Sequence, residues 1–91
     1  MEIRPDQLQW TAERLQGDYR AFSDLPRRAY LSADGKRDVY QTLETSIARA
    51  QKMLGEIERE GAPSAEVRHW QRRLVVLTEM AAADLKAHGK S

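Results

Sequence analysis

The segment 65–88 holds the feature that most limits how this chain can fold. Its pattern predicts one long helix, and the middle of that helix is the apolar run Leu74-Val75-Val76-Leu77. Successive helical residues are turned by about 100°, so four apolar residues in a row are spread around the whole helix. Such a helix cannot lie on a surface with only one face covered. Segment 65–88 therefore needs neighbours on two sides, supplied by the rest of the chain or by another protein.

The segment of about 36–60 is predicted to be the first of these neighbours. It contains apolar residues at alternating spacings of three and four, which is typical of one helical face: Tyr40, Leu43, Ile47, Ala50, Leu54 and Ile57. Gly61 and Pro63 mark the end of this helix, and Ser64 can cap the next one. So short a linker predicts an antiparallel hairpin. The facing stripe on segment 65–88 is Val67, Trp70, Leu74, Leu77, Ala81 and Leu85.

A third helix is predicted at about 5–23, because Pro5 suits a first helical turn and Asp6 suits the helix dipole there. Its apolar stripe is Leu8, Ala12, Leu15, Tyr19 and Phe22. Residues 23–35 break the periodicity with two turn-forming clusters, and one or two helical turns are expected within 26–31. We expect helix 5–23 to fold back onto the hairpin. The fold class is then all-α, a three-helix bundle, with residues 1–91 forming one domain.

Two surfaces are predicted to bind a partner. On helix 5–23, Trp10 lies about 200° from the buried stripe and shares a face with Arg14, Gly17 and Ala21, although the indole can also simply fold over a neighbouring side chain. On helix 65–88, a second apolar stripe runs beside the first. It consists of Val76, Met80 and Ala83, continued by Ala87. We expect the docked helix 5–23 to cover this stripe; otherwise it is left for a partner or for a second copy in a homodimer.

Composition excludes several classes of function. Fifteen basic and fourteen acidic residues give a formal charge of +1, so no overall field attracts nucleic acid or an anionic membrane. Cysteine is absent, which excludes disulfides and thiolate chemistry. The first ten residues lack the apolar core of a signal peptide, and no run approaches 18 apolar residues. We expect a soluble cytoplasmic protein without membrane contact.

No motif predicts catalysis or a metal site. Glu66 and His69 have the Glu-x-x-His spacing of di-iron bundles, but such sites need two of these motifs and further glutamates. Arg72 and Arg73 lie three and four residues after His69, where their charges oppose metal binding. The terminal Gly-Lys-Ser resembles part of a phosphate loop, but no glycine-rich segment precedes it. The expectation is a non-enzyme with no catalytic residue, no metal ligand and no cofactor.

One basic cluster, Arg68, Arg72 and Arg73, has an aromatic residue interleaved. As a phosphate-binding face it would make the chain a nucleic-acid-binding three-helix module, recognisable by a steep salt dependence of binding. The helical periodicity, however, places Trp70 in the stripe that faces the hairpin partner, where its ring is not available to stack on a base. Acidic residues within 56–60 also lie within predicted reach of these arginines. We therefore favour a solvated, ion-paired face and do not expect nucleic acid to be a partner.

Residues 43–85 resemble a known family. The heptad helix, the glycine-containing turn, the His69-Trp70-Gln71-Arg72 segment and the alanine-rich end are similar to the small E-type co-chaperones of type III secretion needles. The resemblance implies a helical hairpin that pairs with a larger tetratricopeptide-like chaperone and keeps the needle subunit soluble before export. Residues 1–33 are longer than this family leads us to expect. The predicted function is an adaptor or co-chaperone; a phage- or host-encoded inhibitor that occludes a partner protein is the alternative.

Overall fold

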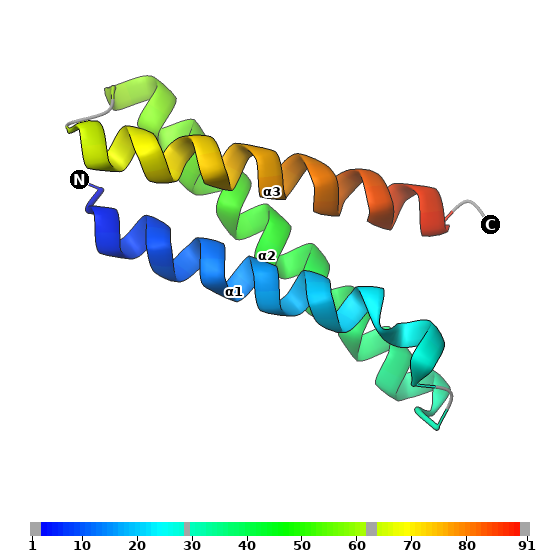
Figure 1. The fold of residues 1–91 in the computed structure, drawn as a ribbon. Helices are drawn as coiled ribbons and strands as arrows, with labels where there is room; N and C mark the ends of the chain where they lie inside the picture. The colour runs from blue at the N-terminus through cyan, green and yellow to red at the C-terminus, as the bar shows by residue number, and fades with distance from the viewer. Residues whose placement is uncertain (1–2, 29, 62–63, 90–91) are drawn as a thin grey trace.

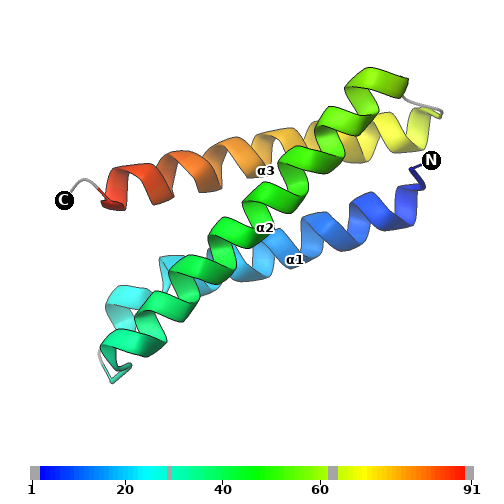
Figure 2. The ribbon, with the colours of Figure 1, turned by 180° about the vertical axis from the view of Figure 1, so that it is seen from behind.

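Three helices packed side by side make up the structure, a computed structural model that describes residues 3–28, 30–61 and 64–89. The elements are α1 (Pro5–Ser23), a short 3-10 turn η1 (Leu25–Arg27), α2 (Ala33–Glu60) and α3 (Ala65–Gly89). Helices α1 and α3 run in the same direction, and α2 runs back between their ends (Figure 1). Seen from behind, α2 crosses both of the others on one side of the bundle (Figure 2). The predicted all-α three-helix bundle is confirmed.

The helices begin where side chains or backbone satisfy the free N–H groups of the first turn. At the start of α1, the Arg4 N–H donates to the side-chain oxygen of Gln7 at 2.9 Å. At the start of α2, Ser32 Oγ accepts a hydrogen bond from the Gly35 N–H at 3.1 Å. The predicted start at residue 36 is therefore wrong by three residues. Ser-Ala-Asp-Gly suits a turn, but serine is also a preferred helix cap, and here it caps.

The end of α2 and the start of α3 follow the sequence pattern. Gly61 has a φ of +81°, a backbone conformation that favours glycine because other residues carry a Cβ there. Ser64 Oγ accepts a hydrogen bond from the Val67 N–H at 3.1 Å, which confirms the predicted cap. Pro63 lies outside the described residues. The helical turns expected within 26–31 are reduced to η1, which begins at Leu25.

One hydrophobic core joins all three helices. Its largest fully buried side chains come from each of them: Leu8, Leu15, Leu43, Val67 and Leu74. Each belongs to a stripe that the sequence predicted. Helix α1 packs along both α2 and α3, and each of these contacts is more extensive than the one between α2 and α3. The docking of α1, one of two outcomes considered from the sequence, is therefore what the chain does.

Within the described residues, two hydrogen bonds to carboxylates and a weaker contact of the Thr11 hydroxyl with the Met53 sulfur, at 3.7 Å, tie α1 to its neighbours. The apolar pattern predicted none of them. Ser46 on α2 donates a hydrogen bond to Asp18 on α1. Tyr19 on α1 donates a hydrogen bond to Asp84 on α3. The Ser46 side chain is buried, and a buried hydroxyl needs such a partner. Because α1 has a polar link to each neighbour, sliding along either of them breaks a hydrogen bond.

An aromatic cluster closes the bundle where α1 ends. The ring of Phe22 lies edge to face with Tyr40 of α2, at 5.5 Å between centroids, and with His88 of α3, at 5.3 Å. Tyr40 and His88 lie 5.7 Å apart. His88 lies in the last turn of α3, and its ring packs against both of the other rings.

Candidate partner-binding groove

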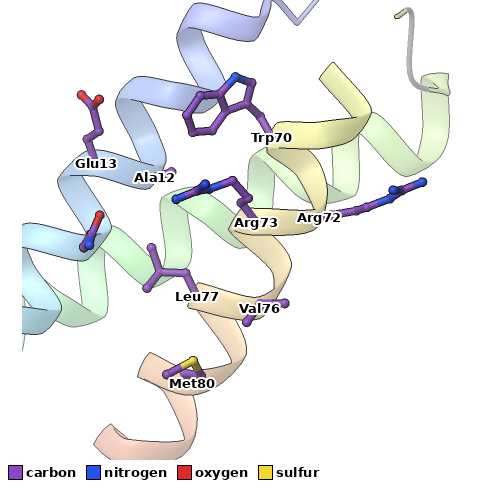
Figure 3. Close-up of a pocket in the computed structure, with 9 residues that line it drawn as sticks. Ala12, Glu13, Trp70, Arg72, Arg73, Val76, Leu77 and Met80 are labelled. Carbon is purple, nitrogen blue, oxygen red and sulfur yellow. The ribbon is translucent and has the colours of Figure 1, made fainter. Parts of the chain in front are cut away.

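An open groove of about 540 Å³ lies between α1 and α3. All of its lining residues belong to these two helices (Figure 3). They are Ala12, Glu13, Gln16, Trp70, Arg72, Arg73, Val76, Leu77 and Met80. The groove exists because α1 and α3 both pack against α2 and meet each other along their inner stripes only. The outer edges of the two helices then form its walls.

The floor of the groove is apolar and accessible. Val76 is 57% exposed and Met80 is 51% exposed, whereas Leu77 beside them is partly buried. Ala83, one turn further along, is also exposed. The expectation that docking of α1 covers this second stripe is therefore wrong. The stripe of α1 faces the core around Leu74, and this position leaves the outer stripe of α3 open.

Trp70 forms one end of the groove. The sequence placed it in the hairpin stripe, but its side chain is only partly buried and its ring extends towards α1 (Figure 3). The guanidinium of Arg73 lies 5.4 Å from the ring centroid, in cation–π geometry. Arg73 extends towards α1 while Arg72 points away from it (Figure 3). An indole and a guanidinium are both common at the centres of protein interfaces.

The two rims of the groove differ in charge. Arg72 and Arg73 line the α3 side. Neither of them, nor Arg68 one turn earlier, forms an ion pair with any residue in the described part of the chain. We expected these arginines to form ion pairs with acidic residues such as Glu56 and Glu58, and this expectation is therefore wrong. Their guanidinium groups keep their hydrogen-bonding capacity for another molecule.

The α1 rim is polar and carries a carboxylate. The side-chain amide of Gln9 donates a hydrogen bond to Glu13 at 3.2 Å. Gln16 follows one turn later and also lines the groove. A ligand lying in the groove therefore meets unpaired cations on one side and a neutral-to-acidic edge on the other.

The second predicted surface, Trp10 with Arg14, Gly17 and Ala21, lies on the outer face of α1. Trp10 is 53% exposed, and the Arg49 guanidinium of α2 lies 5.7 Å from its ring centroid. Arg14 is bound to Asp18 at 3.7 Å. Gly17 is exposed and Ala21 is partly buried. This face is accessible, but its aromatic residue and its arginine already have partners within the chain.

His69 is exposed, and its ring lies 5.6 Å from that of Trp70. Within the described ranges, no three His, Asp or Glu side chains come close enough together to hold a metal ion.

The pKa of the Tyr19 hydroxyl is raised at the contact between α1 and α3. This hydroxyl donates a hydrogen bond to Asp84, and this bond raises the pKa of Tyr19 above its ordinary value; burial and the negative charge of Asp84 raise it further. The raised folded-state pKa means that the protonated phenol stabilises the fold. This stabilisation is complete below pH 10, the ordinary tyrosine pKa, and is lost as the pH rises through the folded-state value.

Replacement of Tyr19 by phenylalanine is therefore expected to remove one pH-dependent contribution to stability. At pH 7 the loss is under about 1 kcal/mol, because this hydrogen bond lies near solvent. Urea unfolding of Tyr19→Phe and of wild type between pH 8 and 11 provides the test. The difference in unfolding free energy should be constant below pH 10 and shrink above it. If the difference in unfolding free energy grows with pH, the Tyr19 hydroxyl is not the donor of this hydrogen bond.

Comparison of the chain with protein-family models, with curated proteins and with solved structures gives no match. No helix within the described residues has the length and apolar composition needed to cross a membrane.

The sequence identified the exposed Val76 and Met80, because a second stripe is visible in the helical pattern. It missed Ala12, Glu13 and Gln16, because no pattern within α1 shows that its outer edge lies beside α3.

Proposed function

We propose that this protein is a non-enzymatic helical interaction module, an adaptor or co-chaperone, which binds an amphipathic helix of a partner protein in the α1–α3 groove. The observation that carries the proposal is the exposed apolar floor at Val76 and Met80. Amphipathic helices bind such grooves by inserting apolar residues spaced at i, i+3 or i+4, and i+7. A contiguous apolar surface rimmed by polar residues is typical of an interaction site.

The kinds of residue in the groove support the same function. Tryptophan, arginine and methionine are all enriched in protein interfaces. The unbranched, polarisable side chain of Met80 can adapt to the shape of a ligand. The partly buried Leu77 lines the groove beside Val76 and Met80, so three apolar side chains of α3 lie next to one another there.

The resemblance of residues 43–85 to the E-type co-chaperones of type III secretion suggests a specific form of this function. We propose that the partner is a helical protein held by this chain before export, with α3 providing most of the contact. The α3 wall of the groove lies entirely within the resembling segment. An export role and a more general adaptor role use the same surface and differ in the partner that occupies it.

The test is site-specific photo-crosslinking in cells of the source organism. A photoreactive amino acid placed at Met80 is expected to form a covalent product with one protein, identified by mass spectrometry. The same group at Gln51, an exposed position on α2, serves as the matched control and should not form that product. Identical products from both positions, or none from Met80, contradict the proposal.

A substitution in the floor provides the accompanying prediction. Val76→Asp is expected to lower the yield of the Met80 crosslink at least tenfold, because a charge replaces an exposed apolar side chain that lines the groove together with Met80. The free energy of unfolding should stay within about 0.5 kcal/mol of wild type, since the side chain is exposed. Thermal unfolding followed by circular dichroism checks the second point. A large loss of stability would make Val76 a core residue.

A further inference from the structure

We propose that the helix bound in the groove is acidic at one end of its apolar face, and that its carboxylates are received by Arg72 and Arg73. This inference rests on the proposed function and narrows the occupant of the groove to one chemical class. The occupant is an amphipathic helix with two or more Asp or Glu residues beside its first or last apolar anchor.

The dimensions of the groove define how much of a helix it can hold. Its α3 wall runs from Trp70 to Met80, which is about 15 Å at 1.5 Å per residue. A bound helix therefore contacts the floor over two to three turns. That length presents three or four apolar anchors, enough to cover Val76, Leu77 and Met80. The charged end of the occupant then lies beside the first half of α3.

The charges at that end favour carboxylates. Arg72 and Arg73 have no ion-pair partner in the described part of the chain. Arg73 is also held over Trp70, which restrains its long side chain before any ligand arrives. A guanidinium binds a carboxylate through two parallel hydrogen bonds, and a preordered side chain loses less entropy on binding. Glu13 on the α1 rim repels further acidic residues, so the occupant is acidic on the α3 side only.

A second copy of this chain fits the groove poorly. In an antiparallel contact between two α3 helices, with Val76 of each opposite Met80 of the other, Arg72 lies opposite Asp84, whose carboxylate already accepts a hydrogen bond from Tyr19. In a parallel contact Arg73 faces Arg73. Like charges at such positions are destabilising and select against the pairing. The exposed stripe therefore matches a different helix better than its own.

Nucleic acid also fits less well than an acidic helix. Single-stranded nucleic acids bind through aromatic faces on which bases stack, within a groove that is positively charged along its length. Here one face of Trp70 is covered by Arg73, and the opposite rim carries Glu13. The floor beyond Trp70 is aliphatic. The groove thus offers cations at one end and apolar contact over the rest.

Two synthetic 18-residue helical peptides test the proposal. Both have the same leucine and alanine stripe, and they differ only at three positions beside one end of it, which carry Glu in one peptide and Lys in the other. Fluorescence anisotropy of labelled peptide measures the Kd for the intact protein. The Glu peptide is expected to bind at least tenfold more tightly. Because the chain has two tryptophans, Trp10→Phe leaves Trp70 as the only one, and its emission should shift to shorter wavelength on binding.

Charge reversal with a matched control makes the test specific. Arg72→Glu combined with Arg73→Glu is expected to weaken binding of the Glu peptide about tenfold. The double variant should then bind the Lys peptide more tightly than the Glu peptide. Arg27→Glu combined with Arg37→Glu changes the net charge by the same amount at exposed positions on η1 and α2 that do not line the groove, and should leave the preference unchanged.

Several results would overturn the inference. Equal affinity for both peptides, with the Trp70 shift present, rejects the acidic occupant and leaves the proposed function standing. Failure of both peptides to bind counts against the proposed function as well. A 20-nucleotide single strand that displaces the Glu peptide from the groove favours nucleic acid instead. A dimer in solution that Val76→Asp converts to monomer favours a second copy.

Discussion

Leu74→Ala is expected to destabilise the protein by about 2–5 kcal/mol, because it removes three buried carbon atoms and leaves a cavity that its neighbours fill only in part. Leu74 has no exposed surface, and it belongs to the core that all three helices share. Domains of this size are stable by about 5–15 kcal/mol in total, so the loss is a large fraction of the stability. The melting temperature should fall by more than about 8 °C.

The matched control for this variant is Leu77→Ala, the same change three residues away. Leu77 is only partly buried, because one side of it lines the groove, so its loss should be clearly smaller. Urea unfolding followed by circular dichroism gives both free energies. Equal losses of unfolding free energy in the two variants would mean that the groove is closed in solution. An unchanged urea midpoint for Leu74→Ala would mean that Leu74 is not a core residue.

Phe22→Ala is expected to cost about 3–5 kcal/mol, through the loss of a large buried ring. Phe22 is buried and makes edge-to-face contacts with Tyr40 and His88, so its removal loosens the end of the bundle where the three helices meet. Aromatic pairs of this kind add about 0.5–1.5 kcal/mol to the effect of burial alone. Because these contacts hold the last turn of α3, amide hydrogen exchange there should also become faster.

Trp10→Ala is the comparison for Phe22→Ala, since both remove an aromatic ring from α1. Trp10 is half exposed and lies beneath Arg49, a contact worth about 0.5–1 kcal/mol at an exposed site. We therefore expect Trp10→Ala to cost no more than about 1 kcal/mol. If it destabilises the protein as much as Phe22→Ala does, the outer face of α1 belongs to the core and its status as an accessible surface is wrong.

The sequence by itself determined the helices and the apolar stripe that each of them turns towards the core. The spacing of Leu43, Ile47 and Ala50 predicts a buried face because an α-helix repeats every 3.6 residues, whatever it packs against. The end of α2 at Gly61 and the cap at Ser64 were equally predictable, since both depend on the local chemistry of the backbone. The start of α2 was not, because Ser32 followed by Asp34 and Gly35 fits either a turn or a cap.

Only the tertiary structure decided where α1 lies and which surface it leaves open. The contacts of Ser46 with Asp18, and of Tyr19 with Asp84, depend on the rotation of one helix against another. A single helical pattern contains no information about that rotation. The groove has the same origin: the outer stripe of α3 could be recognised from sequence, but whether α1 covers it or borders it depends on which side of α3 the docked helix occupies. Packing of α1 against α2 and α3 together fixes that side, because only there can its apolar stripe be buried by both.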